Sequence, residues 1–186
     1  MVHCRAIKGS EWFVCIGGFR GVAIRDVDAF LERLKTVASS SIIQVLDAKH
    51  VAGWEHLFFA AVNAVKALDS KRGLAKNLAI ETLLYASCQD QISKAFQILG
   101  ASPETEELAL IVFSKDERDA ESSFKKAAEV IGLEEDRVLE VTEDKIRILK
   151  RVFDISDPEL ETRGGESPEA LTSLIIERGA LLAARR

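Results

Sequence analysis

The sequence lacks several features that mark whole classes of proteins. Three cysteines occur among its 186 residues, an odd number at wide spacing, which argues against a disulfide framework. No apolar run approaches the ~20 residues that a membrane-spanning helix requires, and the first residues lack the charged-then-apolar order of a signal peptide. Low-complexity tracts are missing as well. We therefore expect a folded, cytoplasmic protein that has no membrane partner.

Motifs for metal and nucleotide binding are also missing. Gly17-Gly18-x-x-Gly21 follows an apolar run, but it lacks the Lys-Ser/Thr of a P-loop and the full dinucleotide fingerprint, so we interpret it as a flexible turn. His3, Cys4 and Cys15 lack the paired close spacings of structural zinc. The sequence therefore predicts no metal site and no cofactor.

Catalytic residues are hard to assemble from this sequence. Cys88 paired with His50 or His56 would supply a nucleophile and a base, but no pattern places them together. The Ala-rich helical patterns of residues 47–100 are instead typical of a segment that packs and presents a surface. We expect a partner-binding protein that is not an enzyme and has no small-molecule substrate. An uncharacterised small enzyme is the alternative.

The order of apolar patterns predicts a mixed α/β (α+β) fold, a helix-rich single domain over residues 1–186 packed with a small β-sheet. The expected strands are residues 2–7, 12–16, 42–46, 108–113 and 137–141, and the first two form a hairpin around Lys8-Gly9-Ser10-Glu11. The expected helices follow Asp26, Asp90, Ser114 and Thr142, cover residues 53–68 and 78–86, and start at Ser167-Pro168. Residues 154–166 are expected to be a loop.

The last expected helix carries an apolar stripe with one cation. The stripe consists of Leu171, Leu174, Ile175, Arg178 and Leu182. This i, i+3, i+4 spacing suits a helix that docks in the groove of a partner, and it suits packing against the chain's own core equally well. We expect the apolar stripes of the chain to exceed what the fold itself buries, which would leave a patch for a neighbouring protein.

Charge is distributed unevenly along the chain. The net charge is −5, so the molecule as a whole is not an obvious polyanion binder. Residues 66–76, which we name the basic segment, contain only one acid, Asp69, and four cations: Lys66, Lys71, Arg72 and Lys76. These cations either contact phosphates or form a solvated loop between two helices.

The central part of the chain resembles a known family. The relevant residues are Asp47-Ala48-Lys49-His50-Val51, His56, the small-residue run 60–67, Asn77-Leu78-Ala79-x-Glu81 and Ala86-Ser87-x-x-x-Gln91-Ile92. In these residues the chain resembles the Cgi121/TPRKB family, the accessory subunits that bind the small atypical kinase of the KEOPS complex. The resemblance runs from about Ile42 to the end of the chain.

The resemblance implies a function and two partners. KEOPS makes threonylcarbamoyladenosine (t6A) next to the anticodon of ANN-reading tRNAs, and this family is implied to be a non-catalytic subunit that docks on the amino-terminal lobe of the kinase. The stripe of the last helix would then be the kinase interface. Archaeal members are implied to grip the tRNA 3′ CCA end, for which the candidates are Lys66, Lys71, Arg72, Lys76, Gln89 and Gln91.

One departure from the family pattern concerns the tRNA contact. Where the family commonly has Ser-Gly-x-Arg-Gln-Ile, this chain has Ser87-Cys88-Gln89-Asp90-Gln91-Ile92. An arginine forks to a phosphate, whereas Asp90 repels it. The resemblance therefore supports kinase docking more strongly than tRNA binding. A standalone tRNA- or RNA-binding module is a further alternative.

Overall fold

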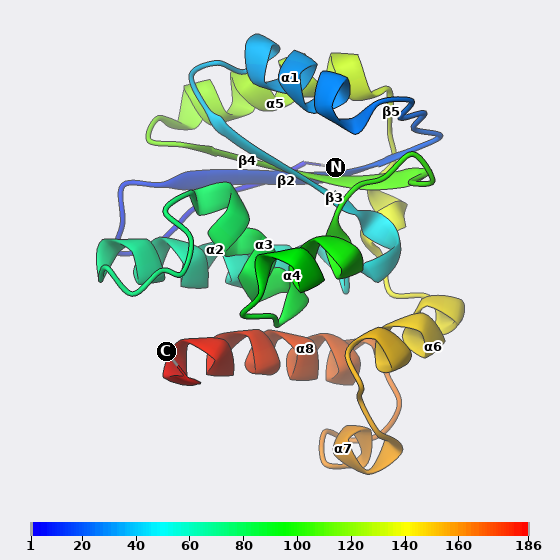
Figure 1. Cartoon of the computed structure of the whole chain (residues 1–186). Helices are drawn as coiled ribbons and strands as arrows, with labels where there is room; N and C mark the ends of the chain where they lie inside the picture. The colour runs from blue at the N-terminus through cyan, green and yellow to red at the C-terminus, as the bar shows by residue number, and fades with distance from the viewer. Residues whose placement is uncertain (1, 186) are drawn as a thin grey trace. The chain divides into compact units, whose positions relative to one another are not determined.

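The computed structural model describes residues 2–185, with side chains up to Ala184. It is a mixed α+β fold with more helix than strand and one small sheet, so the predicted fold class is confirmed. The chain divides into two compact units (Figure 1). The sheet unit comprises the residues through Ala48 together with Gly100–Val138, and the helical unit comprises Lys49–Leu99 and the residues from Leu139 onward. A single domain over residues 1–186 stays a prediction.

The sheet unit is built on an antiparallel sheet. Its strands are β1 (His3–Ala6), β2 (Phe13–Arg20), β3 (Ile42–Asp47), β4 (Glu107–Ser114) and β5 (Leu133–Glu134). The order is β1-β2-β4-β3, and β5 pairs with the end of β2. β2 and β4 form the centre, and seven of the eight β4 residues are buried. Continuous burial explains why residues 108–113 form an apolar run rather than an alternating one.

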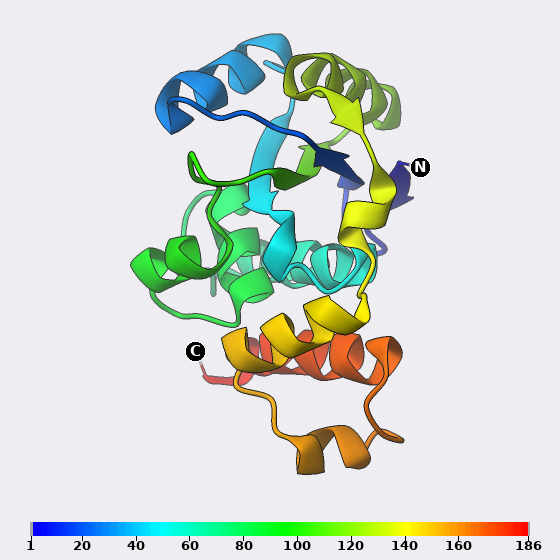
Figure 2. The same ribbon diagram turned by 90° about the vertical axis from the view of Figure 1, so that its right-hand side faces the viewer.

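Two amphipathic helices complete the sheet unit. α1 (Val27–Val37) starts at Asp26, whose carboxylate accepts the Ala29 amide, and α5 (Glu117–Ile131) starts at Asp116, which accepts the Asp119 amide. Both helices lie on the same face of the sheet (Figures 1 and 2). There Phe124 of α5 packs against Phe19 of β2, with ring centroids 6.0 Å apart. The cap that we expected at Ser114 is wrong by two residues.

The hairpin of β1 and β2 corrects our expectation about the cysteines. The register places Cys4 opposite Cys15, with Cα atoms 4.1 Å apart, and the two form a disulfide. The sequence separation of 11 residues is wide along the chain, but the hairpin folds it back on itself. The glycines that follow were also misassigned, since Gly17 and Gly18 continue strand β2 rather than forming a turn.

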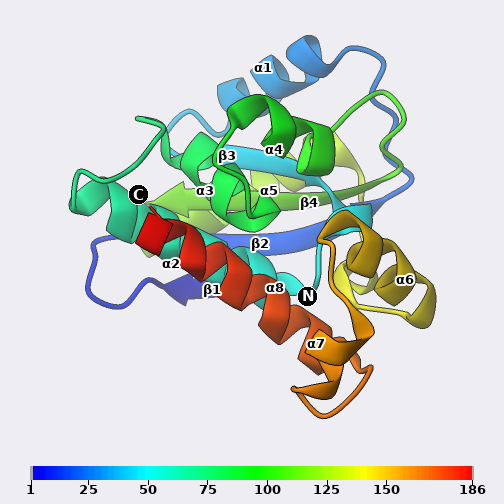
Figure 3. The ribbon, with the colours of Figure 1, turned by 60° about the horizontal axis from the view of Figure 1, so that its bottom comes forward.

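The helical unit contains α2 (Trp54–Asp69), α3 (Leu78–Ser87), α4 (Ile92–Leu99), α6 (Glu143–Val152), α7 (Asp157–Glu161) and α8 (Pro168–Leu182). α3 contacts α2, α4 and α8, and nine of its ten residues are buried, as its all-round apolar pattern predicted. α8 runs alongside α2 (Figure 3). Among the described residues, none of the helices is both long and apolar enough to cross a membrane.

Two expected elements of residues 133–166 differ from the structure. Residues 137–141 were expected to be a strand, but Asp136–Leu139 is a short 3₁₀ helix and the strand β5 lies just before it. Residues 154–166 were expected to be a loop, but they contain α7. α7 starts with a capping box, in which the Glu159 carboxylate accepts the Ser156 amide at 2.8 Å. The same carboxylate oxygen also accepts the Ser156 hydroxyl at 2.8 Å.

Candidate functional site

The helical unit contains a cavity of about 820 Å³. The turn after α3, the end of α6, α7 and the second half of α8 line it. This volume lies within the range of ~300–1,000 Å³ that is usual for binding sites. Leu174 and Leu182 of α8 form part of the apolar wall of the cavity and are buried, whereas Leu181 at the end of the same helix is 47% exposed.

The cavity receives only part of the predicted α8 stripe. Leu174, Arg178 and Leu182 line it. Leu171 and Ile175 do not, because both have no exposed surface and pack in a cluster with Phe153. All four apolar side chains of the stripe are therefore core residues of the helical unit, and they are not an exposed docking surface. Their role toward a kinase stays a prediction, and only those that line the cavity are within reach of a partner.

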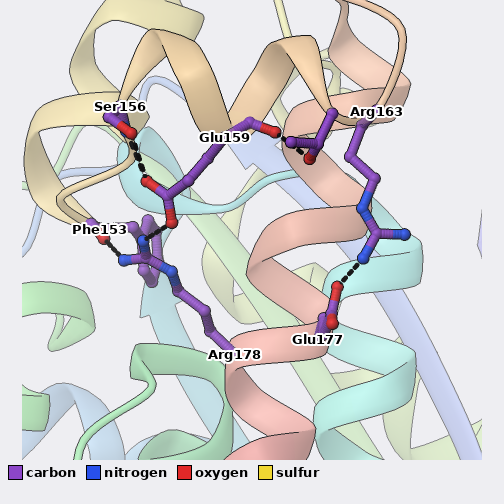
Figure 4. Close-up of polar contacts among 7 residues, drawn as sticks. Phe153, Ser156, Glu159, Arg163, Glu177 and Arg178 are labelled. Atoms are coloured by element: carbon purple, nitrogen blue, oxygen red, sulfur yellow. Dashed lines mark hydrogen bonds and ion pairs between the residues drawn. The ribbon is translucent and has the colours of Figure 1, made fainter.

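Arg178 is held in place by several hydrogen bonds (Figure 4). Its guanidinium donates to the Phe153 carbonyl oxygen and to the Glu159 carboxylate. The hydrogen bonds from the Ser156 amide and hydroxyl, followed by the one from Arg178, lower the pKa of Glu159 to about 2. Glu159 thus remains ionised at neutral pH and keeps Arg178 at the cavity rim.

Two further sets of ion pairs fix the segment around α7. Arg163 pairs with Glu177 of α8 (Figure 4). Lys150 of α6 pairs with Asp157 and also with Glu166, the latter at 2.8 Å. These ion pairs connect the segment between α6 and α8 to both helices, and each of them uses a cation that would otherwise be available to a ligand.

Gly179 allows α8 to approach α3. A Cβ atom at this position would lie 2.8 Å from the Tyr85 carbonyl oxygen, closer than real Cβ contacts come. Cys88 follows at the end of α3 in the left-handed region, with φ 55°. Its Sγ lies 3.5 Å from the Ile175 carbonyl oxygen. The close contact of the two helices thus forms the inner wall of the cavity.

The residues considered for catalysis are engaged elsewhere. Burial raises the pKa of Cys88 to about 12, so the thiol is not poised as a thiolate nucleophile. His56 accepts the Ala52 amide through Nδ1 at 3.1 Å and donates through Nε2 to the Ala86 carbonyl at 2.8 Å, and burial lowers its pKa to about 4. His50 contacts the Ile98 carbonyl oxygen. The structure therefore does not pair Cys88 with either histidine.

The basic segment is a separate feature of the helical unit, and none of its cations lines the cavity. Lys66, Lys71, Arg72 and Lys76 are all exposed. Within residues 2–184, none of the four has a carboxylate within the 4.0 Å of an ion pair. This contrasts with Lys150, Arg163 and Arg178, all of which are paired.

The remaining predicted tRNA contacts divide between two places. Gln89 is partly buried and lines the cavity, whereas Gln91 is exposed at the start of α4 and does not. Asp90 between them is exposed. The structure therefore does not gather the two glutamines and the four cations into one site.

Exposed apolar side chains concentrate in the helical unit. Among the residues with described side chains, five large exposed ones belong to it and only Leu133 belongs to the sheet unit; the five are Phe59, Leu74, Ile92, Phe96 and Leu181. Only contiguous apolar surface marks interaction sites, and single exposed apolar side chains are usual on a protein surface. These five side chains come from α2, the basic segment, α4 and α8, and none belongs to the predicted stripe. A leftover patch that receives a neighbouring protein therefore stays a prediction.

Several residues of the site escaped prediction from the sequence. Leu181 lies next to Leu182, and helical spacing alone did not separate the buried leucine from the exposed one. Glu159 and Arg163 escape prediction because the polar, Pro- and Gly-containing sequence of residues 154–166 indicates a loop. The pattern Ser156-x-x-Glu159 is a capping-box signal that could have revealed α7. Among residues 2–184, no group of three or more His, Cys, Asp or Glu side chains could hold a metal ion.

Comparisons with known proteins extend over both features of the helical unit. The family model described as "Kinase binding protein CGI-121" matches residues 22–183. A curated protein of Methanocaldococcus jannaschii, "Regulatory protein Cgi121", is 34% identical to this chain over 141 residues, which are 75% of this chain and 83% of that protein. The family match includes the basic segment, the turn after α3 and all of α8.

Proposed function

Because this chain belongs to the CGI-121 family of kinase-binding proteins, as its residues predicted, we propose that it is a non-catalytic subunit of KEOPS. In this function it binds the small atypical kinase subunit and supports t6A modification of tRNA. Its place of action is the cytoplasm. The family membership supports the kinase as partner, and the KEOPS assignment follows from the resemblance of the central residues.

The observation that carries the proposal is the exposed Leu181 at the end of α8, next to a cavity with apolar walls. Protein interfaces combine a buried apolar centre with a polar rim. At the end of α8 the exposed Leu181 lies beside a cavity whose wall includes Leu174 and Leu182, with Arg178 and Glu159 at its rim. We therefore assign the kinase contact to the second half of α8 and to the rim of this cavity.

Charge at the rim favours a particular kind of partner segment. Asp154, Glu159 and Glu177 provide three carboxylates, whereas Arg163 and Arg178 provide two cations that are already paired. The rim thus carries a net negative charge, and a segment with one apolar side chain next to a lysine or arginine would complement it.

Leu181→Asp tests this assignment. Leu181 is 47% exposed, so the change leaves the core intact while placing a charge at the proposed contact. We expect the affinity for the kinase subunit of the same organism to fall at least about tenfold, equivalent to ~1.4 kcal/mol, in isothermal titration calorimetry. Leu133→Asp is the matched control, since Leu133 is 59% exposed and belongs to the sheet unit. Equal affinities for the two variants would place the interface elsewhere.

The basic segment supports a second part of the proposal, contact with tRNA. Four exposed cations without acidic partners are available to phosphates, and each phosphate contact with a single strand adds about −0.7 to the slope of log affinity against log salt. Gln89 and Gln91 stay candidates for contacting the CCA end. We expect tRNA affinity to fall steeply with salt and to weaken when CCA is trimmed, measured by filter binding. A flat salt response would remove the basic segment from the function.

The standalone RNA-binding module and the small enzyme remain as alternatives to be tested. An RNA-binding module would bind tRNA but not the kinase subunit. An enzyme that used Cys88 would lose turnover in Cys88→Ala. The raised pKa of Cys88, to about 12, and the two backbone contacts of His56 support the non-catalytic proposal.

A further inference from the structure

Glu81 is a buried carboxylate that contacts the backbone of the basic segment. It lies in the first turn of α3 and has no exposed surface. Its Oε2 accepts the hydrogen bond of the Ala75 amide at 2.8 Å. Ala75 follows Lys71 and Arg72 and immediately precedes Lys76. Because burying a carboxylate is unfavourable unless it is hydrogen-bonded, an apolar residue would serve simple packing better at this position.

The first half of the basic segment is fixed by the end of α2. The Arg72 and Gly73 amides both donate to the Ala67 carbonyl oxygen, at 2.8 and 3.1 Å. Lys71 takes the left-handed conformation, with φ 57°, which turns the chain back over the helix end. These backbone bonds hold the residues up to Gly73 independently of any side chain.

The second half depends on α3. The Glu81 carboxylate holds Ala75, and the Asn77 side chain caps α3 through the Ala79 amide at 2.8 Å. Little free space remains between the two halves. A Cβ atom at Gly73 would lie 2.8 Å from Leu68 Cδ2 and 3.1 Å from the Ala75 carbonyl oxygen. The position of the backbone between Gly73 and Lys76 is therefore set by contact with Glu81.

We propose that Glu81 is a positioning residue that holds the basic segment in the arrangement that binds RNA phosphates. The inference rests on the tRNA contact proposed above. Lys71, Arg72 and Lys76 flank the held amide on both sides, and all three are exposed and unpaired within residues 2–184. A segment that is fixed before binding loses less conformational freedom when it binds. Glu81 thereby contributes to RNA affinity without touching RNA.

The first measurement tests the positioning itself, without RNA. Glu81→Ala removes the acceptor, and Glu81→Gln keeps a side-chain oxygen at its place. We expect hydrogen exchange of a peptide over residues 70–77 to become about tenfold faster in Glu81→Ala and to stay near wild type in Glu81→Gln. Trypsin should cleave faster after Lys76, which follows the held Ala75 amide, in Glu81→Ala. Asp69→Asn is the matched control, because it removes an exposed carboxylate of the same segment.

The second measurement uses a single-stranded RNA oligonucleotide that ends in CCA. We expect Glu81→Ala to bind it about tenfold more weakly, and its salt slope to be smaller by about 0.7, the value of one phosphate contact. A residue with a purely structural role would lower the amount of folded protein but leave the slope unchanged. Glu81→Gln should restore both affinity and slope.

A second variant keeps the test decisive if Glu81→Ala does not fold. Gly73→Ala leaves Glu81 unchanged but adds a methyl group that is too close to Leu68 and to the Ala75 carbonyl oxygen. It should therefore displace the same turn and reduce the salt slope in the same way. Wild-type exchange and wild-type RNA affinity in Glu81→Ala would overturn the role of Glu81. A wild-type protein whose RNA binding does not respond to salt would instead overturn the proposed tRNA contact itself.

Discussion

The sheet unit and the helical unit treat apolar surface differently. In the sheet unit, α1 and α5 close over one face of the sheet, and among its described side chains only Leu133 is large, apolar and exposed. The helical unit also has a closed cluster, around Ile175 and Phe153, yet it exposes five large apolar side chains. The sheet unit thus buries nearly all of its large apolar side chains fully or partly, whereas the helical unit leaves five of its own exposed.

Ile175→Asp is expected to have the largest effect on stability, because it places a charge in the buried apolar cluster of the helical unit. Ile175 has no exposed surface, so the new carboxylate would be buried without a partner. We expect the free energy of unfolding to fall by about 4 kcal/mol or more, measured by urea denaturation. Leu181→Asp, six residues along the same helix, should change it by less than about 1 kcal/mol. A folded Ile175→Asp that only loses partner binding would mean that the α8 stripe is surface after all.

Reduction of the Cys4–Cys15 disulfide tests how much this bond contributes to the stability of the sheet unit. Cross-linking a loop of this length contributes about 3 kcal/mol to stability. We expect a reducing agent to lower the melting temperature, and Cys4→Ser to reproduce the loss without added reductant. Cytoplasmic proteins are usually kept reduced, so alkylation directly after cell lysis provides an independent readout. Two alkylated thiols on the hairpin in that experiment would show that the bond forms only after purification.

The disulfide also shows what the sequence could have predicted. The hairpin around residues 8–11 was expected from its apolar runs and its polar turn. Its register follows from the turn, since the Ile7 amide donates to the Trp12 carbonyl oxygen. Three residues further out on each strand, the same register places Cys4 opposite Cys15. The error was to judge the cysteines by their spacing along the chain and not by their place in the predicted hairpin.

The cavity could not have been predicted in the same way. Helical periodicity correctly identified the inner face of α8, because burial of Leu171 and Ile175 repeats with the helix turn. The exposure of Leu181 depends on where α7 and α6 pack, and those contacts join residues that lie far apart in the sequence. The basic segment was found because its cations are close together in the chain. Its anchoring by Glu81 was not found, because a side chain in one helix holding the loop before it leaves no periodic signal.

Acidification is expected to weaken the helical unit through His56. Burial lowers the pKa of His56 from its ordinary value of 6.5 to about 4 in the folded protein. Between these values the unfolded chain binds a proton that the folded chain does not, so the stability from His56 is fully present above pH 6.5 and is lost as the pH falls toward 4. We expect a loss of up to about 3 kcal/mol at ~1.4 kcal/mol per pH unit, seen as a falling urea midpoint. His56→Gln retains both hydrogen bonds without titrating, so it should flatten this part of the profile. If His56→Gln showed the same pH dependence of the urea midpoint as the wild type, the titration of His56 would not be the cause of the loss.

The smallest effects are expected from the cations, and they distinguish the two surfaces of the helical unit. Arg178 pairs with Glu159 and bonds the Phe153 carbonyl, with a side chain that is 31% exposed, so Arg178→Gln should lower the free energy of unfolding by about 1 kcal/mol. Arg72 has no such partner within residues 2–184, and Arg72→Gln should change it by less than about 0.5 kcal/mol. The order should reverse for RNA, where only Arg72→Gln weakens binding and lowers the salt slope. If the two variants lost equal amounts of stability, ion pairing would not be what distinguishes a cation that stabilises the fold from one that is available to RNA. Both residues are arginines of the helical unit, and they differ in the contacts that each makes.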